Sequence, residues 1–241
     1  MLPSLGGASP ILIAPPKDEQ VYERLRRAIV EGRVMPGQEL AVANLAVELG
    51  VSRIPVMRAC QRLIGEGFLE TNARRSVVVA PLTDARVVEE FTLLDALECM
   101  AVRVAAEAGS RGHIVARWQR INATMARHMD DDTPDACAAG NLEFHAAVWD
   151  SLSSPYVRNL VALIWDHLEP ARQLATVNTP WERSGSVAEH QAICDAVLRG
   201  DPAAAEAAVR AHRQNHVARV RATLRQRDQS DQRHAGSSKS L

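Results

Sequence analysis

The chain has 241 residues, of which 46% are hydrophobic and 24% are charged, and its formal net charge is −1. This composition is typical of a soluble globular protein with one large domain or two ordinary ones, and it excludes a mainly disordered chain. No apolar run approaches the roughly 20 residues that span a bilayer, and the first residues lack the basic region of a signal peptide. We therefore expect a cytoplasmic protein.

Charge is distributed unevenly along the chain. Residues 1–82 contain ten Lys and Arg against eight Asp and Glu, a balance of +2, which leaves −3 for the rest. So small an excess does not by itself indicate nucleic-acid binding, and a solvated face of ordinary helices would also explain it. The arginines of this part could nevertheless line one surface that neutralises phosphates. They are Arg24, Arg26, Arg27, Arg33, Arg53, Arg58, Arg62, Arg74 and Arg75.

The first predicted elements are three helices followed by a β-hairpin. A Pro-rich segment, residues 1–16, is predicted to be a flexible arm, and apolar residues at helical spacing then continue to Gly32. A turn at residues 35–37 leads to a second helix that Gly50 stops, and Ser52 can cap a third. Two β-prone runs flank residues 72–75 and predict a wing. This order predicts a winged helix-turn-helix over residues 17–82, a fold typical of DNA-binding proteins.

The second part of the chain has only helical patterns. We predict an all-α domain of six or seven helices over residues 83–226, so that the fold class is mostly α. The last segment, residues 227–241, has almost no apolar content and is predicted to be a disordered tail. On the first helix of this domain the spacing predicts one buried stripe. It consists of Leu94, Leu97, Ala101, Val104 and Ala108.

Three histidines lie on the apolar faces of separate predicted helices. His145, His190 and His212 each stand three or four residues from apolar residues of the same helix, so all three are expected to face inward. A single histidine on such a face is more often a satisfied core residue than a ligand. Three of them on separate helices could instead converge on one metal ion, because imidazole is a common ligand of divalent transition metals.

Two blocks of the sequence resemble one family. Pro36-Gly37, Leu49-Gly50 and the run from Ser52 to Val56 are similar to the N-terminal reader of GntR-type bacterial transcription regulators. Farther along, Asn141 with Phe144-His145, the run from Ser186 to His190, and Gly200-Asp201 with His212 resemble the FCD ligand-binding domain of the FadR subfamily. The resemblance covers about residues 17–225, and its two blocks stand in the family's order.

The resemblance implies a homodimer that sets two recognition helices into successive major grooves of a pseudo-palindromic double-stranded DNA operator. Ser52 and Arg53 match the DNA-contacting start of the recognition helix. Ile54 and Met57 stand where members carry a hydroxyl and a DNA-facing arginine, so the operator is expected to be unusual or weakly bound. The remaining candidate DNA contacts are Arg58, one residue beyond the lost arginine, and Arg74 and Arg75 in a wing without its usual tip glycine.

The resemblance also implies a metal ligand set. His145, His190 and His212 match the family's three histidine ligands, and Asn141 stands where members usually have an aspartate. An amide oxygen can still ligate, but a neutral ligand set leaves the charge of a divalent ion uncompensated and favours an anionic effector as a further ligand. Zinc or nickel would suit these ligands, and His216 is an alternative ligand or a supporting neighbour.

The resulting hypothesis is a metabolite-responsive transcription regulator, a repressor released by a small organic acid. The family's effector-binding arginine has no counterpart at Leu94-Asp95, so Arg103 and Arg172 are candidate substitutes, with ordinary surface charges as the alternative. One rival hypothesis is a DNA-binding regulator with a vestigial, non-responsive pocket. The other is a metal-dependent hydrolase, which needs a general base near the metal, and the spacing places no carboxylate beside these histidines.

Overall fold

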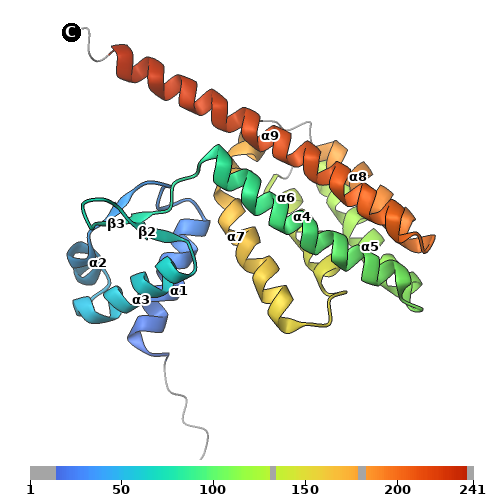
Figure 1. The fold of residues 1–241 in the computed structure, drawn as a ribbon, viewed down its shortest axis with the longest axis horizontal. Coiled ribbons are helices and arrows are strands. Elements are labelled where there is room, and N and C mark those ends of the chain that lie inside the picture. Colours follow the sequence, from blue (N-terminus) through green and yellow to red (C-terminus); the bar gives the residue numbers. More distant parts are fainter. Residues whose placement is uncertain (1–14, 131–133, 179–182, 238–241) are drawn as a thin grey trace, which may run out of the picture. The chain divides into compact units, whose positions relative to one another are not determined.

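The structure is a computed structural model of the chain and describes residues 15–130, 134–178 and 183–237. Packing divides the chain into two compact units, Met1–Pro81 and Leu82–Leu241, which are drawn in one ribbon in Figure 1. The predicted domain boundary falls at nearly the same place. Most of the predicted N-terminal arm lies outside the described residues, and helix α1 begins at Lys17.

The first unit is a winged helix-turn-helix, as predicted. Its helices are α1 (Lys17–Val30), α2 (Val42–Glu48) and α3 (Arg53–Gly65), and its strands are β1 (Glu39–Leu40), β2 (Leu69–Thr71) and β3 (Val77–Val79). The strands form an antiparallel sheet in the order β1-β3-β2. The hairpin of β2 and β3 is the predicted wing, whereas β1 was not expected, because two residues are too few to show an alternating pattern.

Apolar residues at helical spacing hold the three helices of this unit together. Leu25 and Ile29 of α1 are buried, as are Val56 and Leu63 of α3. Gly50 makes the corner between α2 and α3 with a φ of +64°, a backbone conformation that L side chains rarely adopt. The burial of one face of α3 leaves its opposite face available for a partner.

The second unit consists of six helices within the described ranges. They are α4 (Asp84–Glu107), α5 (Arg111–Asp130), α6 (Pro134–Trp149), α7 (Pro155–Asn178), α8 (Arg183–Leu198) and α9 (Pro202–Ser237). Thr83 caps α4 by accepting a hydrogen bond from the backbone N–H of Arg86. Helix α4 runs beside α9 in Figure 1 and packs on it more extensively than on any other element. This arrangement confirms the predicted mostly α fold.

Aromatic side chains fill the centre of the helical unit. Phe91, Trp118, Phe144 and Trp165 are each at most 2% exposed and belong to one continuous core. The three histidines predicted to face inward are buried in the same region. The core of this unit therefore surrounds the candidate metal site.

Two expectations for the helical unit need correction. Helix α9 continues to Ser237, so residues 227–237, predicted to be disordered, are helical, and only residues 238–241 of that segment lie outside the described part. Arg, Gln, Ala and Asp can continue an established helix without an apolar face, which the composition argument overlooked. The predicted stripe on α4 is also shifted, since Val104 is 40% exposed and Glu98 is only 2% exposed.

Within the described ranges, no helix is sufficiently long and apolar to cross a membrane.

Candidate metal centre

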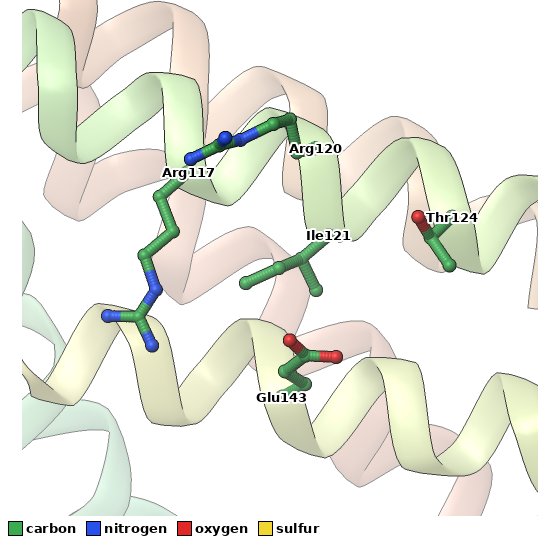
Figure 2. Close-up of a pocket in the computed structure, with 5 residues that line it drawn as sticks. All are labelled: Arg117, Arg120, Ile121, Thr124 and Glu143. Atoms are coloured by element: carbon green, nitrogen blue, oxygen red, sulfur yellow. The ribbon is translucent and has the colours of Figure 1, made fainter.

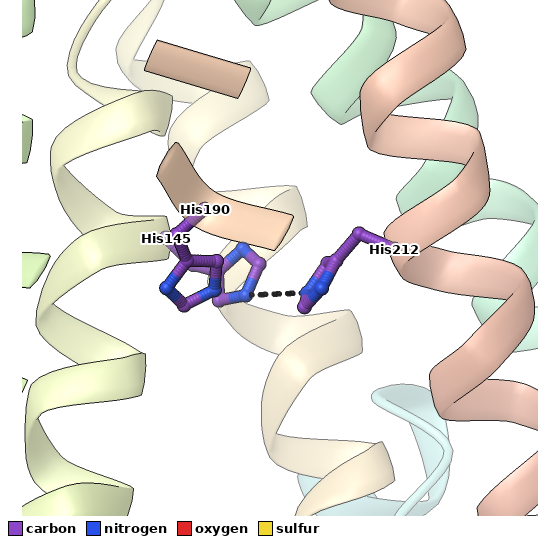
Figure 3. Close-up of side chains that lie close together, drawn as sticks. All are labelled: His145, His190 and His212. Carbon is purple, nitrogen blue, oxygen red and sulfur yellow. Dashed lines mark hydrogen bonds between the residues drawn. The ribbon is translucent and has the colours of Figure 1, made fainter. Parts of the chain in front are cut away.

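The helical unit brings three histidines together from three helices. His145 comes from α6, His190 from α8 and His212 from α9, and Figure 3 shows their rings turned toward one another. One ligand nitrogen from each lies within 4.8 Å of the other two. The three residues are 3%, 0% and 2% exposed. The structure thus places the three sequence-predicted histidines in one buried group.

Each of these rings is held by its Nδ1 atom. Nδ1 of His145 lies 2.8 Å from a carboxylate oxygen of Glu98, and Nδ1 of His212 lies 2.6 Å from a carboxylate oxygen of Glu189. Nδ1 of His190 lies 3.2 Å from the side-chain oxygen of Asn122, whose amide nitrogen in turn donates to a backbone carbonyl. All three partners present an oxygen, so each neutral imidazole carries its proton on Nδ1 and donates it.

These hydrogen bonds fix the tautomer and leave an unprotonated Nε2 on every ring. The Nε2 atoms of His145 and His212 are 3.3 Å apart, and with both protons on Nδ1 neither atom can donate to the other. Nε2 of His190 is buried and has no hydrogen-bond partner among the described residues. Three lone pairs therefore meet in the core with no proton between them. A cation among the nitrogens would satisfy these lone pairs.

Electrostatics keeps the three rings neutral. Burial lowers the pKa of His145 to about 4, although the Glu98 carboxylate acts in the opposite direction. Burial also lowers the pKa of His212 despite its bond to Glu189, and it holds the pKa of His190 well below the usual value. The two histidine–carboxylate pairs are therefore hydrogen bonds of neutral imidazole near neutral pH. Neutral imidazole is the form that ligates a metal ion.

The arrangement fits a divalent transition metal. Imidazole nitrogens oriented by hydrogen bonds from their other ring nitrogen to carboxylate or carbonyl oxygens are the usual surroundings of zinc and related ions. Asn141 lies on α6 one turn before His145 and is half-buried. Its assignment as a fourth ligand stays a prediction. His216 is partly buried and does not belong to the group whose ligand atoms meet.

Glu98 joins the histidine group to a buried ion pair, and the sequence reasoning did not find it. Its carboxylate accepts from His145, from Nε1 of Trp149 at 3.0 Å and from the guanidinium of Arg213. Burial alone would raise the pKa of Glu98, but Arg213 and His145 hold it well below its usual range. A charged residue inside an otherwise apolar helical stripe was the signal that could have revealed it.

The two candidate effector-binding arginines have different surroundings. Arg172 of α7 is 7% exposed, and its guanidinium lies 3.6 Å from the centre of the Trp165 ring, which in turn lies 4.9 Å from the ring of His145. The side chain of Arg103 is 55% exposed and pairs with Glu206. Of the two candidates, Arg172 is therefore connected to the histidine group through a direct ring contact.

A separate surface groove lies between α5 and α6. It has a volume of about 380 Å³ and is shown in Figure 2. Its lining consists of Arg117, Arg120, Ile121, Thr124 and Glu143. None of the three histidines contributes to it, and Arg117 is already paired with Asp150 at 2.7 Å. We do not assign the groove to the metal centre.

The candidate DNA contacts lie on the exposed side of the first unit. Arg53 begins α3 and Ser52 directly precedes it, and both are exposed. Within the described part of the chain, no side-chain hydrogen bond of Ser52 caps this helix. Arg58 is exposed and lies 3.9 Å from Asp18. Arg74 and Arg75 are exposed at the wing tip, where the side chain of Asn72 accepts backbone N–H bonds from Arg74 and Ser76.

Two apolar residues interrupt this basic surface. Ile54 is 63% exposed and Met57 is 50% exposed, and both lie on the outer face of α3. Exposed apolar side chains on the outer face of a recognition helix can contact thymine methyl groups but cannot neutralise phosphates. The surface therefore retains arginines at the start of α3 and at the wing, with an apolar patch between them on the helix.

Comparisons with known proteins agree with both units. The FCD domain family matches residues 89–215, and the family described as bacterial regulatory proteins, gntR family, matches residues 17–79. The HTH-type transcriptional regulator BphR of Paraburkholderia xenovorans (strain LB400) is 27% identical over 225 residues, covering 90% of this chain and 91% of that protein.

Two solved structures have a similar fold. E. coli McbR/YncC has a TM-score of 0.69 at 20% identity and covers 88% of this chain and 100% of its own. The metal-free FCD domain of TM0439 has a TM-score of 0.50 at 14% identity and covers 61% of this chain and 99% of its own. At such identities the likeness concerns the fold alone.

These matches decide between the classes of function that the sequence left open. The gntR family is described as bacterial regulatory proteins and the relative BphR as a transcriptional regulator, which removes the hydrolase hypothesis. The carboxylates of Glu98 and Glu189 do lie beside the histidines, but they come from other helices, so helical spacing could not predict them. The chain therefore belongs to the gntR family of bacterial regulatory proteins, as a DNA-binding transcription regulator with an FCD domain.

Proposed function

We propose that this regulator is a homodimeric repressor that holds a divalent metal, zinc or nickel, and releases a pseudo-palindromic operator when a small carboxylate binds the metal. The observation that carries the proposal is the set of three buried Nε2 lone pairs of His145, His190 and His212, which have no proton between them. The bound metal supplies a positive charge with a coordination position that a carboxylate can occupy. Asn141 is the proposed fourth protein ligand.

The chain's own residues provide the rest of the mechanism. Glu98, Glu189 and Asn122 hold the three imidazoles in the tautomer that ligates. Because Asn141 is neutral, the ligand set has no negative charge of its own, and an acid is attracted to the metal more strongly than it would be beside an aspartate. In this proposal the acid binds the DNA-free form more tightly than the DNA-bound form, which is the condition for any release of the operator.

The first experiment is selection of bound sites from fragmented genomic DNA by the purified protein, at low and at near-physiological salt. A palindromic site that survives the higher salt supports a sequence-specific regulator, and salt-sensitive binding without a consensus contradicts it. The selected operator then serves in a second experiment that compares metal-loaded with metal-free protein, each with and without acetate as a probe acid. Release of DNA by acetate only from the metal-loaded protein supports the metal-centred sensor.

The rival, a regulator with a vestigial pocket, is favoured by the departure at Asn141. It predicts that operator affinity is the same with and without metal and acid. The matched variants for this comparison are His190→Gln, which removes one proposed ligand, and His113→Gln, which changes an exposed histidine outside the centre. His190→Gln should abolish retention of the metal through dialysis, whereas His113→Gln should retain it.

At the DNA surface, Arg53→Ala should weaken operator binding by about 1–3 kcal/mol, since an arginine at the start of a recognition helix can pair bidentately with guanine. Arg199→Ala is the control, because Arg199 is an exposed arginine of the helical unit. Fluorescence anisotropy with the selected operator measures both variants. An unchanged affinity of Arg53→Ala would remove Arg53 from the proposed DNA contacts.

A further inference from the structure

Beside the histidine group, α7 and α9 carry buried N–H groups without acceptors. Nε1 of Trp165, Nε of Arg213 and Nε2 of His216 are buried and have no hydrogen-bond partner in the described part of the chain. Nδ1 of His216 lies 3.4 Å from a guanidinium nitrogen of Arg219, which can only donate, so the proton of this neutral ring is on Nε2. All three atoms are thus donors, and a buried donor without an acceptor destabilises the fold.

These donors belong to one side of the metal centre. The ring of Trp165 lies 4.9 Å from that of His145 and 3.6 Å from the guanidinium of Arg172. His216 follows His212 by one turn of α9, and the ring of Phe91 lies 5.5 Å from His216 and 5.6 Å from the guanidinium of Arg213. Helices α7 and α9 also pack against each other. Donors and guanidinium groups therefore gather where these two helices meet the histidines.

The charges of this region do not balance once a divalent ion is bound. Glu98 balances Arg213, and Glu169, 3.2 Å from Arg172, balances the second guanidinium. The carboxylate of Glu189, beside His212, is balanced by the charge of Arg219. The three histidines are neutral, so the two charges of a divalent metal remain. Burial also lowers the pKa of Arg172 to about 10, although the Glu169 carboxylate acts in the opposite direction. Two further negative charges would make the buried region neutral.

We propose that the effector is a small dicarboxylate, with one carboxylate on the metal and the other bound by Arg172 and the N–H groups of Trp165, Arg213 and His216. This inference rests on the proposed function and adds the ligand class and the residues of the distal site. A carboxylate has only acceptors, so it satisfies donors that a hydroxyl or an amide would satisfy less completely. A dianion also supplies the two negative charges that the buried region lacks.

The test compares ligands of equal size that differ in one charge. Zinc-loaded, full-length protein is titrated by isothermal calorimetry with succinate and with succinamate, then with glutarate and glutaramate, and with acetate as the probe for the metal alone. The dicarboxylate of at least one pair should bind about tenfold or more tightly than its monoamide, because hydrogen bonds to charged groups are the stronger ones. Equal affinities of the dicarboxylate and its monoamide in both pairs would overturn the dicarboxylate proposal. Binding of acetate in the same experiment would still support the metal-centred sensor.

Two variants locate the distal site. Arg172→Gln should bring the dicarboxylate-to-monoamide ratio toward one and leave acetate affinity unchanged, whereas Arg103→Gln, an exposed arginine paired with Glu206, should leave the ratio as it was. Trp165→Phe keeps an aromatic ring beneath Arg172 but removes the N–H, so it should weaken succinate or glutarate binding even if Arg172→Gln fails to fold. The proposed site would be contradicted if Arg172→Gln and Trp165→Phe both fold and both keep the native dicarboxylate-to-monoamide affinity ratio. Absence of any binding, acetate included, would contradict the carboxylate sensor as well.

Discussion

At the scale of single residues, one carboxylate organises the metal centre. Glu98 accepts hydrogen bonds from three donors on two other helices, and it is the counter-charge of the buried Arg213. An acid that is 2% exposed is stable in a core only when its oxygens are bonded and its charge is balanced. Glu98 therefore combines a structural role with orientation of the ligand His145.

Replacing Glu98 should damage both roles. Glu98→Gln leaves Arg213 without its carboxylate and offers one acceptor oxygen where three donors point, so the free energy of unfolding should fall by about 3–5 kcal/mol. Zinc affinity should fall about 10- to 100-fold, since His145 loses the partner that fixes its tautomer. Chemical denaturation and competition with a zinc chelator measure the two effects.

Glu89→Gln is the matched control on the same helix, because Glu89 is exposed. Its free energy of unfolding should lie within about 0.5 kcal/mol of the native value. A Glu98→Gln protein as stable as this control would show that the buried network does not need the charge.

At the scale of the elements, the corner between α2 and α3 depends on one glycine. Gly50 has a φ of +64°, and no atom lies within 4 Å of a Cβ placed there. The cost of Gly50→Ala is therefore backbone strain without a clash, about 1–2 kcal/mol. Hydrogen exchange of peptides from α2 and α3 should be at least about five times faster in this variant than in the native protein.

Gly65→Ala separates strain from side-chain effects. Gly65 ends α3 with an ordinary φ, and a Cβ there also meets nothing within 4 Å. Alanine should stabilise this helix by up to about 1 kcal/mol, since it favours helical backbone more than glycine does. Faster exchange in both variants would contradict the argument from the sign of φ.

Helix α4 shows why a periodic pattern can misplace a buried face. Leu94 and Ala101 are buried as expected, but Val104 is 40% exposed, and the face between the two correct residues includes Glu98. Helices α5 to α9 all pack on α4, so its buried face is wide and includes a polar side chain that they satisfy. A pattern based on hydrophobicity assigns a glutamate to the outside because it contains no information about those partners.

At the scale of the whole molecule, the buried histidines make stability depend on pH. Burial lowers the pKa of His145 to about 4, and it lowers those of His190, His212 and His216 below the usual 6.5. In the unfolded chain each takes up a proton near pH 6.5, which the folded protein resists. Unfolding therefore binds protons below pH 6.5, and the free energy of unfolding of the metal-free helical unit should fall as the pH decreases from 6.5 toward 4.

The slope should be about 1.4 kcal/mol per pH unit for each proton taken up. Tryptophan fluorescence is the appropriate measurement, because Trp118, Trp149 and Trp165 are buried in the core of the helical unit and the sequence has no tryptophan before Trp118. His216→Gln should reduce the slope by the contribution of about one proton, and His113→Gln should leave the slope unchanged. A stability that does not vary over this range would contradict neutral, buried histidines.

The sequence by itself determined the local elements and the family of this protein. Helical spacing, Gly50 and the β-prone runs around residues 72–75 were sufficient for the winged helix-turn-helix, and the inward spacing of His145, His190 and His212 identified the three residues that meet in the core. These features depend on neighbours within one or two turns of the same helix, so a linear pattern contains them.

Only the tertiary structure decided what surrounds those histidines. Glu98 holds His145, Asn122 holds His190 and Glu189 holds His212, and in each pair the two residues lie on different helices. No spacing rule connects residues of different helices. The tautomer of each ring, the lowered pKa values and the unsatisfied donors beside Arg172 all depend on these contacts between helices. Burial and hydrogen bonding in a core depend on which surfaces pack together, and this is the reason that the chemistry of the site became visible only in the folded protein.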